Sequence, residues 1–239
     1  MPGPFEHTAE VYDLLYAATG KDYAAEAADL HALIQSLRPG AATLLDVACG
    51  TGAHLAHLRR WYAVTGVDIE PNMLAVARRR CPDVDLVEAD MRDMALGRRF
   101  DAVTCLFSSV AYGDDLAGAV AAMAAHAAPG GVVVVDGWIR PERWLDPAPP
   151  HPLMARSEDG SLAVSRMGAS TTDGRRTRLD LQYLIGRTGE PTEHVVEQHD
   201  LVLYRDDEYR AAFAAAGLSA DVVAGPYPDR DRYVGTASA

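Results

Sequence analysis

The chain has 239 residues, 22 basic and 34 acidic side chains, and a formal net charge of −12 at neutral pH. This length allows one large α/β domain with a full core, and the acidic balance argues against a general nucleic-acid binder, which would present a basic face. With three scattered cysteines, no apolar stretch long enough for a membrane helix and an acidic N-terminus unlike a signal peptide, the sequence predicts a cytoplasmic protein without disulfides or membrane contact.

The N-terminal part is expected to form a helical cap over residues 1–40. Its strongest signal is a helix over residues 22–38, with apolar side chains at helical spacing. Upstream of this helix, Tyr12 and Tyr16 stand one helical turn apart and either anchor the segment on the core or face a cofactor. Aromatic faces attract a sulfonium or an ammonium group, so Tyr12 and Tyr23 are candidate cofactor-binding residues.

A glycine turn follows a short buried strand over residues 43–47. The turn is Ala48-Cys49-Gly50-Thr51-Gly52, and the next predicted strand, residues 63–67, ends on Asp68. In a βαβ unit this order places Asp46 beside the turn and Asp68 at the tip of the neighbouring strand. Glycines let a nucleoside approach the backbone, and the second acid accepts hydrogen bonds from ribose hydroxyls. The predicted binding residues are Asp46, Ala48, Cys49, Gly50, Gly52 and Asp68.

The turn does not match the common phosphate-binding motifs. Leu55 stands where a dinucleotide fingerprint has its third glycine, and no Gly-Lys-Ser/Thr follows, which excludes a P-loop. Two glycines with flanking acids and no lysine suit a cofactor that has ribose and amino groups but no phosphate, a description that S-adenosylmethionine (SAM) meets. A third acid, Asp90, follows a strand over 84–87 and is expected to bind the adenine amino group, with Met91 against the ring. Two further apolar residues complete the expected cofactor set, Met73 and Leu106.

The following elements continue the alternation of strands and helices. The turn Pro129-Gly130-Gly131 precedes four consecutive valines, which is typical of a buried central strand. This succession predicts a parallel sheet covered by helices on both faces. Helices are expected over 53–61, 71–80, 114–127 and 208–216, and further strands over 100–105, 131–135, 219–223 and 232–236.

The region after Gly137 has a different pattern. Five prolines between residues 141 and 152 argue against regular structure there. From Leu162 to Tyr204, apolar and polar residues alternate between turn signals, as expected for antiparallel hairpins with one solvated face. We expect an antiparallel substrate lid over residues 140–200, inserted after the fifth strand of the sheet.

Several segments resemble class I SAM-dependent methyltransferases, namely Asp46 to Gly52, Asp90 to Asp93, Phe107 to Val110 and Pro129 to Val132. More specifically, Val11-Tyr12-Asp13 and Gly20 to Glu26 resemble the N-methyltransferases of nucleotide-linked amino sugars, as in desosamine and mycaminose biosynthesis, and the similarity runs nearly end to end. The resemblance implies a single α/β domain with a Rossmann-like, mostly parallel seven-stranded sheet. It also implies methyl transfer from SAM to the amino group of a thymidine-diphosphate (dTDP) amino deoxysugar, once or twice, in antibiotic biosynthesis.

Two residues are candidates to orient the amine. Tyr112 stands where this family has a histidine or tyrosine after its Phe-Ser-Ser block, although it could instead pack the lid, and Asp136 ends a central strand where a glutamate is expected. The sulfonium of SAM is already a reactive methyl donor, and no His–acid pair is evident near the glycine turn, the strand-end acids or the Phe107–Tyr112 loop. We therefore expect alignment, not base catalysis, to supply most of the rate. On this expectation Tyr112→Phe costs at most about tenfold in turnover.

Binding the diphosphate of such a substrate requires arginine side chains, whose planar guanidinium groups can donate two parallel hydrogen bonds to phosphate. The resemblance implies that Arg166, Arg178 and Arg230 supply them. Trp138 is a further candidate for substrate binding. His54, in the helix after the glycine turn, is expected at the surface or in support of the site. No histidine shows metal-ligand spacing with an acid or cysteine, so no metal is expected.

Two other functions are compatible with the sequence. One is O- or C-methylation of another small molecule, which usually needs a dedicated base or a metal. The other is a non-catalytic SAM-binding partner protein, which would have no need for arginines that converge on the crevice. The sequence leaves open which sugar is bound, which carbon bears the amine, whether one or two methyl groups are added, and whether the protein is a monomer or a homodimer.

Overall fold

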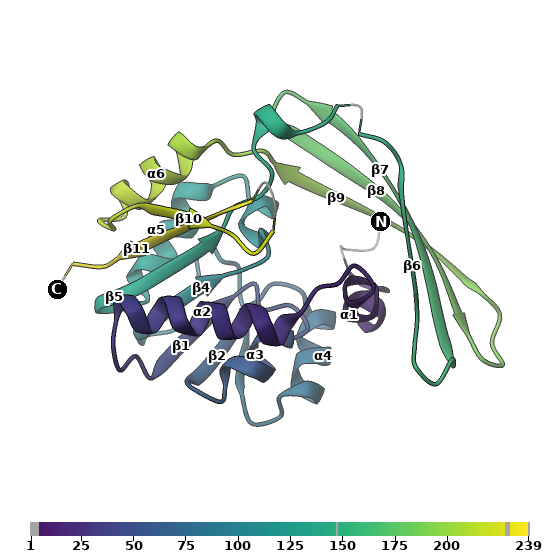
Figure 1. Cartoon of the computed structure of the whole chain (residues 1–239), viewed down its shortest axis with the longest axis horizontal. Helices are drawn as coiled ribbons and strands as arrows, with labels where there is room; N and C mark the ends of the chain where they lie inside the picture. The colour runs from purple at the N-terminus through teal and green to yellow at the C-terminus, as the bar shows by residue number, and fades with distance from the viewer. Residues whose placement is uncertain (1–4, 147, 228–229, 239) are drawn as a thin grey trace.

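The computed structural model describes residues 5–146, 148–227 and 230–238 and contains two sheets (Figure 1). Sheet A forms the body of the molecule, with seven strands in the order β10-β11-β5-β4-β1-β2-β3. Strands β1 to β5 are parallel, β11 is antiparallel to β5, and β10 is antiparallel to β11. The predicted mostly parallel seven-stranded sheet is confirmed. Its strands are β1 (Thr43–Val47), β2 (Ala63–Asp68), β3 (Asp85–Glu88), β4 (Phe100–Cys105), β5 (Ala127–Asp136), β10 (Asp221–Ala224) and β11 (Asp231–Thr236).

Helices cover both faces of sheet A, as predicted. These helices are α2 (Tyr23–Leu37), α3 (Ala53–Leu58), α4 (Pro71–Arg80), α5 (Leu116–Ala125) and α6 (Asp206–Ala215). Helix α1 (Ala9–Ala17) packs on the second sheet, and η1 (Ser109–Tyr112) and η2 (Pro141–Arg143) are short 3-10 turns. Successive side chains of a strand point to opposite faces, so Val132 and Val134 pack with α2 and α3 while Val133 and Val135 pack with α5 and α6. Each fully buried valine contributes about 1.5–3 kcal/mol, which explains the run of valines in β5.

Sheet B is antiparallel, in the order β6-β7-β8-β9. One face packs on Val11 and Leu15 of α1, and the other is exposed, as the alternating pattern predicted. We expected no regular structure up to Pro152. This prediction is wrong for β6, which contains Pro152. β6 pairs only with β7, and an edge strand tolerates a residue that lacks an N–H. The strands of sheet B are β6 (His151–Arg156), β7 (Leu162–Asp173), β8 (Arg176–Arg187) and β9 (Glu193–Val202).

The element boundaries differ from the predictions mainly at glycines and caps. The turn expected at Pro129-Gly130-Gly131 is a bulge inside β5, which already pairs with β4 at Ala127 and resumes the pairing at Val132. Gly130 has a φ of +67°, which a bulge residue of this kind requires. Helix α5 starts at residue 116 because the Asp115 side chain accepts the N–H of Gly118.

The arrangement of the strands places the binding site. β1 and β4 are neighbours in sheet A although β2 and β3 lie on the other side of β1, so the strand order reverses between them, and ligands of open α/β sheets bind outside the strand ends at such a point. Sheet B lies beyond this edge (Figure 1). No helix in the described ranges is long and apolar enough to cross a membrane. Residues 1–4 of the expected N-terminal cap and residue 147 of the expected lid lie outside the described residues.

Candidate functional site

The glycine turn after β1 is shaped for contact with its backbone. Ala48, Gly50 and Gly52 have φ values of +56°, +56° and +72°, in the left-handed region that side chains disfavour. A Cβ at Gly50 would meet no atom within 4 Å, whereas a Cβ at Gly52 would lie 3.1 Å from the Cβ of Ala77 in α4. Gly52 therefore lets α4 pack against the turn, and the backbone at Gly50 borders open space that a ligand can enter.

Asp68 ends β2 and fixes the shape of this turn. Its Oδ2 accepts the N–H of Gly50 at 2.7 Å, and its Oδ1 accepts the N–H of Glu70 at 2.9 Å. Burial raises the pKa of the Asp68 carboxyl, and these backbone hydrogen bonds oppose the shift. A carboxylate has about four acceptor sites, so Asp68 can hold the turn and still accept a hydroxyl group of a ligand.

Asp46 lies one residue before the end of β1, on the other side of the turn. It is buried, and its Oδ1 accepts a hydrogen bond from the Oγ1 of Thr104 at 2.8 Å. Burial raises its pKa to about 6, because the charged form loses its hydration. A cationic ligand in the crevice would stabilise the ionised form of Asp46. Cys49, in the turn itself, is buried in an apolar cluster with Leu55.

The outer side of the expected cofactor site contains Asp90 and three apolar residues. Arg92 pairs with both oxygens of Asp90, and this hydrogen bonding lowers the pKa of Asp90. The Asp90 carboxylate is therefore already bound to a guanidinium, a partner that sequence analysis did not provide. Met73 and Leu106 are buried, and Met91 is half-buried against the core.

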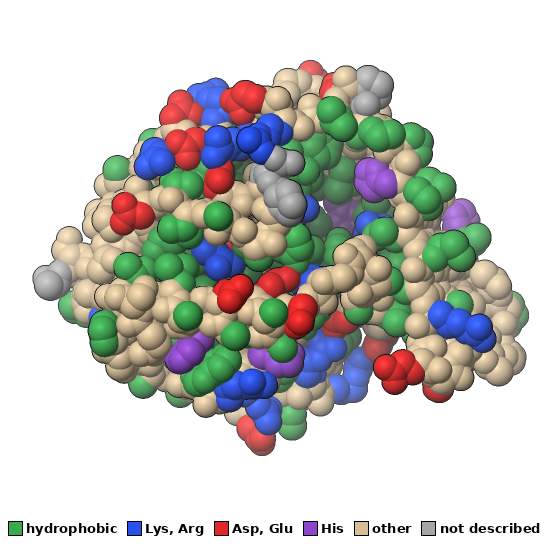
Figure 2. All heavy atoms as spheres, viewed as in Figure 1, with side chains coloured by type: hydrophobic (Ala, Val, Ile, Leu, Met, Phe, Trp, Pro, Cys, Tyr) green, Lys and Arg blue, Asp and Glu red, His purple; other side chains and the backbone are tan. Residues whose placement is uncertain are grey.

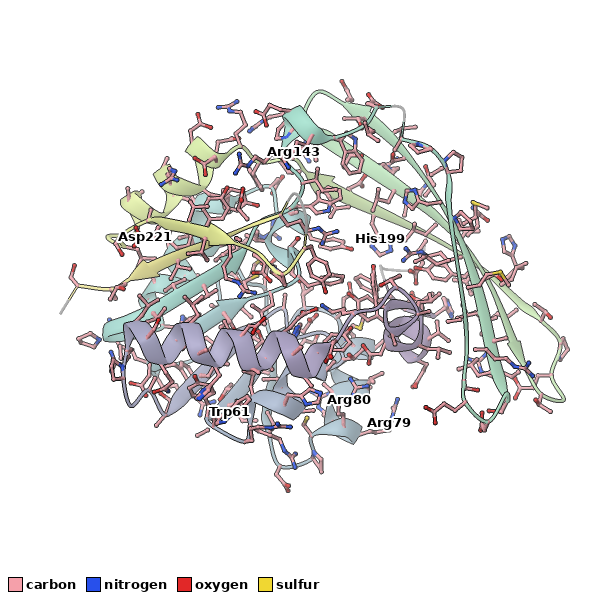
Figure 3. The ribbon with its side chains drawn as sticks, viewed as in Figure 1. Trp61, Arg79, Arg80, Arg143, His199 and Asp221 are labelled. Carbon is pink, nitrogen blue, oxygen red and sulfur yellow. The ribbon has the colours of Figure 1, made fainter. Side chains whose placement is uncertain are left out.

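Helix α1 is attached to the glycine turn through Asp13. The Oδ1 of Asp13 accepts hydrogen bonds from Thr51 Oγ1 at 2.9 Å and from Tyr23 Oη at 3.1 Å, and its Oδ2 pairs with Arg80 at 2.6 Å (Figure 3). Tyr23 thus lies beside the turn, edge-on to the ring of His54. Sequence analysis did not identify Asp13 as a site residue, although it lies in the Val11-Tyr12-Asp13 motif.

A second buried network is centred on Glu26 of α2. Its carboxylate pairs with Lys21 at 2.7 Å and with His54 at 2.8 Å, and it also accepts a hydrogen bond from Tyr227. The Lys21 ammonium lies 3.8 Å from the centroid of the Phe107 ring, within cation–π range. Lys21 was not a predicted site residue, because a lone lysine in an arginine-rich chain reads as a compositional bias. His54 is buried, in support of this network and not at the surface.

A cavity lies where α1 and η1 meet the inner face of sheet B. Figure 2 shows the surface hollowed between the two sheets. Phe107, which follows β4, lies edge-on to Tyr16 at 4.9 Å, so this cavity adjoins the strand ends of sheet A. Tyr12 and Tyr16 both line it, whereas only Tyr12 was a predicted binding residue. The polar and aromatic residues that dominate its wall are Tyr12, Tyr16, Tyr112, Arg166, Tyr183 and His199.

The structure corrects the expectation that no His–acid pair lies near the Phe107–Tyr112 loop. The Oη of Tyr112 is 2.9 Å from Nδ1 of His199, whose Nε2 is 3.2 Å from Oε2 of Glu197. His199 and Glu197 belong to β9, and His199 points into the space between the sheets (Figure 3). Their spacing of two residues places both on one face of a strand. Sequence analysis could not place that face against Tyr112.

The side chain of Asp136 has a structural role. Its Oδ1 accepts a hydrogen bond from Arg232 at 2.7 Å, and its Oδ2 accepts the N–H of Phe107 at 3.0 Å. Phe107 and Ser108 both have positive φ, at 54° and 65°, so Asp136 holds a strained loop in place. Asp136 was expected to orient a substrate amine; the structure instead gives its buried carboxylate two protein partners.

The predicted substrate residues fall into two groups. Arg166 lines the cavity, and its Nε has no hydrogen-bond partner among the described residues; Arg230 lies over Phe107 and donates to Ser108. Arg178 instead points to the exposed face of sheet B and pairs with Asp200, so the structure does not bring it to the others.

Trp138 packs against Trp144 in a buried cluster and does not line the cavity. Within the described ranges, no group of three or more histidine, cysteine or acidic side chains is placed to hold a metal ion.

Comparison with known proteins agrees with this geometry. A family model described as a methyltransferase domain matches residues 44–131. The chain is 43% identical to the dTDP-3-amino-3,6-dideoxy-alpha-D-glucopyranose N,N-dimethyltransferase of Streptomyces fradiae, over 97% of this chain and 91% of the relative. Among solved structures, DesVI of Streptomyces venezuelae superposes with a TM-score of 0.90 at 41% identity, over 97% of this chain and 98% of DesVI.

SAM-bound CalS10, an amino pentose methyltransferase from Micromonospora echinaspora involved in calicheamicin biosynthesis, superposes with a TM-score of 0.84 at 41% identity, over 95% of this chain and 97% of CalS10. The open backbone at Gly50, the acids at the ends of β1 and β2 and the aromatic cavity beside them fit SAM as the cofactor. This chain is therefore a SAM-dependent methyltransferase, and it belongs to the family of the N-methyltransferases of dTDP-linked amino sugars.

Proposed function

We propose that this enzyme transfers methyl groups from SAM to the amino group of a dTDP-linked amino deoxysugar, once or twice, in antibiotic sugar biosynthesis. The observation that carries the proposal is the guanidinium of Arg166 in an aromatic cavity, with its Nε unpartnered among the described residues. An unpaired buried donor costs free energy until a ligand satisfies it. A phosphate oxygen is a strong acceptor for such a group.

Two guanidinium groups flank one pair of aromatic rings. Arg166 lies 5.6 Å from the Tyr16 ring centroid, and Arg230 lies 5.4 Å from the Phe107 ring centroid. The two rings are in turn edge-on to each other. We assign the diphosphate of the substrate to Arg166 and Arg230, on either side of this pair. Arg178 is left out of the assignment because it faces solvent and is paired with Asp200.

The cofactor is assigned to the glycine turn. Asp68 is the acceptor for ribose hydroxyls, Asp46 supplies negative charge close to the cationic part, and Tyr23 lies beside them. Bound SAM supplies an activated methyl group, so the protein has to align the substrate nitrogen and exclude water. The described part of the N-terminal cap, residues 5–40, and sheet B, residues 151–202, serve as the walls that close over the reactants. The adenine is assigned to Asp90 and the apolar residues Met73, Met91 and Leu106.

Methylation of a defined substrate tests this function. With SAM and dTDP-3-amino-3,6-dideoxyglucose, we expect products heavier by one and two methyl groups, with the methyl carbons bonded to nitrogen in NMR spectra. The same nucleotide sugar with a hydroxyl in place of the amine should not react. Methylation of that hydroxyl compound would instead favour an O-methyltransferase.

The role of the diphosphate is tested with two arginine variants. Arg230→Ala should raise the KM for the nucleotide sugar at least about tenfold, because a charge-assisted contact is lost, while the SAM affinity stays near normal. Arg178→Ala is the matched control and should behave as the wild type. A free amino sugar that is turned over as well as its nucleotide form would contradict the assignment.

We place this activity in the cytoplasm, where the buried free thiols of Cys49, Cys81 and Cys105 stay reduced. The enzyme acts as a monomer or a homodimer, which gel filtration distinguishes.

A further inference from the structure

Polar side chains form a hydrogen-bonded line from the cavity into the protein. Tyr112 contacts His199, His199 contacts Glu197, and the Oγ1 of Thr8 donates to Oε1 of Glu197 at 2.8 Å. The side chains of His199 and Glu197 are each only 1% exposed. Tyr112 keeps 41% of its surface exposed while it lines the cavity. The line thus starts where a substrate can touch it and ends on a buried acid.

The hydrogen bonds have one consistent direction. With Glu197 as a carboxylate, which only accepts hydrogen bonds, Nε2 of His199 is the donor to Glu197. In a neutral imidazole the other nitrogen is then an acceptor, so Nδ1 accepts the O–H of Tyr112. The Tyr112 oxygen then keeps a lone pair that can accept a proton from a substrate, and its own proton is directed at His199.

We propose that Tyr112, His199 and Glu197 form a proton relay that takes up the proton which the substrate nitrogen must lose. The relay rests on the amine-methylating function proposed above. An N–H bond of the substrate breaks, its electron pair stays on nitrogen, and the proton moves to the Tyr112 oxygen. The Tyr112 O–H proton passes at the same time to Nδ1 of His199. Tyr112 ends as a neutral phenol, and His199 ends as an imidazolium beside the Glu197 carboxylate.

The chemistry of N-methylation requires that the substrate nitrogen lose a proton. An amine flanked by electron-withdrawing groups titrates near a pH of about 8, so much of it is protonated and unreactive at neutral pH. Each methyl transfer also leaves the nitrogen as a cation, which must lose a proton before a second transfer. Burial raises the pKa of the Tyr112 hydroxyl, so a phenolate is not the base; in the relay the phenol is neutral before and after the transfer.

The groups around His199 include an aromatic ring, a carboxylate and a guanidinium. Phe5 lies edge-on to its ring at 4.7 Å, and Glu197 is the carboxylate in direct contact. Arg166 lines the same cavity. The titratable groups that share the cavity with His199 come from every surrounding element: Tyr12 and Tyr16 of α1, Tyr112 of η1, His151 of β6, Arg166 of β7 and Tyr183 of β8.

The pH dependence of turnover tests the relay. His199→Asn keeps an acceptor for the Tyr112 hydroxyl but cannot take up a proton. At about pH 6.5 its kcat should fall at least about 100-fold, the lower end of the range for general-base catalysis. The loss should shrink to under about tenfold near pH 9.5, where the free amine is already neutral, and the affinity for SAM should not change. His194→Asn is the matched control, since His194 lies on the exposed face of the same strand.

Two further variants keep the test decisive. Glu197→Gln should show the same pH-dependent loss, and it substitutes for His199→Asn if that variant does not fold. Tyr112→Phe should lose as much as His199→Asn, and the double variant should be no worse than either, because the residues act as one unit. A loss that does not change with pH, or losses that multiply in the double variant, would overturn the relay.

NMR of protein with 15N-labelled histidine gives a readout independent of activity. We expect His199 to carry its proton on Nε2, with Nδ1 unprotonated; a proton on Nδ1 would contradict the relay. Wild-type turnover separates the two proposals. No methylation of any amino-sugar nucleotide would reject both the proposed function and the relay. Wild-type methylation with a His199→Asn pH profile parallel to that of the wild type would reject the relay alone.

Discussion

Asp46 is the residue through which pH is expected to act on cofactor binding. Burial raises its pKa to about 6, so it is neutral below this pH and a carboxylate above it. SAM is a cation and favours the ionised form, so its affinity should rise between about pH 5 and 7 and then level off. Calorimetric titrations across this range check the prediction, and Asp46→Asn should remove the rise. An affinity of the wild type that does not vary over this range would contradict it.

Asp68 should contribute directly to SAM affinity. Asp68→Ala removes a charged acceptor and also releases the N–H of Gly50, so SAM should bind more weakly by roughly 1–3 kcal/mol. Asp68→Asn keeps the shape of the side chain and should lose less. Urea unfolding of both variants shows whether the turn itself has been damaged. Unchanged SAM affinity in Asp68→Ala would contradict the assignment of Asp68 as the acceptor for the ribose hydroxyls.

At the residue scale, the sequence is informative where function depends on neighbours along the chain. The acids at the ends of β1 and β2 and the glycine turn between them belong to one βαβ unit, and their positions follow from its geometry. The pairing of Tyr112 with His199 joins residues 87 positions apart. No local sequence pattern indicates such a contact. The expected tenfold limit for Tyr112→Phe assumed that no His–acid pair lies near this tyrosine, and the structure shows one.

The Glu26 network is expected to stabilise the junction of α2, α3 and the C-terminal loop. Burial alone would raise the pKa of Glu26, but hydrogen bonds from His54, Lys21 and Tyr227 lower it to about 2. A carboxyl with a depressed pKa stabilises the fold above its unfolded pKa, about 4.3, and loses this contribution as the pH falls toward 2. Glu26→Gln should therefore cost about 3 kcal/mol at neutral pH.

Urea unfolding of wild type and Glu26→Gln at pH 7 and pH 3 measures this contribution. The difference between the two proteins should be smaller at the lower pH. Asp29→Asn, at an exposed position of the same helix, should leave the stability within about 0.5 kcal/mol of the wild type. Equal stability of Glu26→Gln and wild type at pH 7 would show that the network contributes nothing.

Most elements could be predicted because hydrophobic periodicity reports on burial. The two strands that were missed or cut short are exceptions for local reasons. β6 contains Pro152. A proline removes a backbone hydrogen bond of the sheet, and it disrupts the sheet only in a strand that pairs with a neighbour on both sides. β5 contains a bulge at Gly130, which has the residues of a turn and yet continues the strand. Both features depend on which neighbour a strand has, and a single sequence does not specify that neighbour.

Over the whole molecule, the sequence predicted the layers but not how sheet B faces the cavity. Alternating polarity gave sheet B one apolar face, and that face packs on α1. The same alternation decides which arginines are useful: Arg166 points inward, and Arg178 points outward to Asp200. Resemblance alone did not distinguish them. With a net charge of −12 on the chain, an anionic substrate depends on such inward arginines for its binding.

The contacts that complete both halves of the site join the two ends of the chain. Thr8 and Glu197 are separated by 189 residues, and Lys21 and Tyr227 by 206. Contacts of such high sequence separation form late, because a long loop must close first. During synthesis the parallel core of sheet A can therefore assemble while the relay and the Glu26 network are still incomplete. A ribosome must finish almost the entire polypeptide before the protein can act, so a prematurely terminated product would retain a folded core and lack an enzyme's active site.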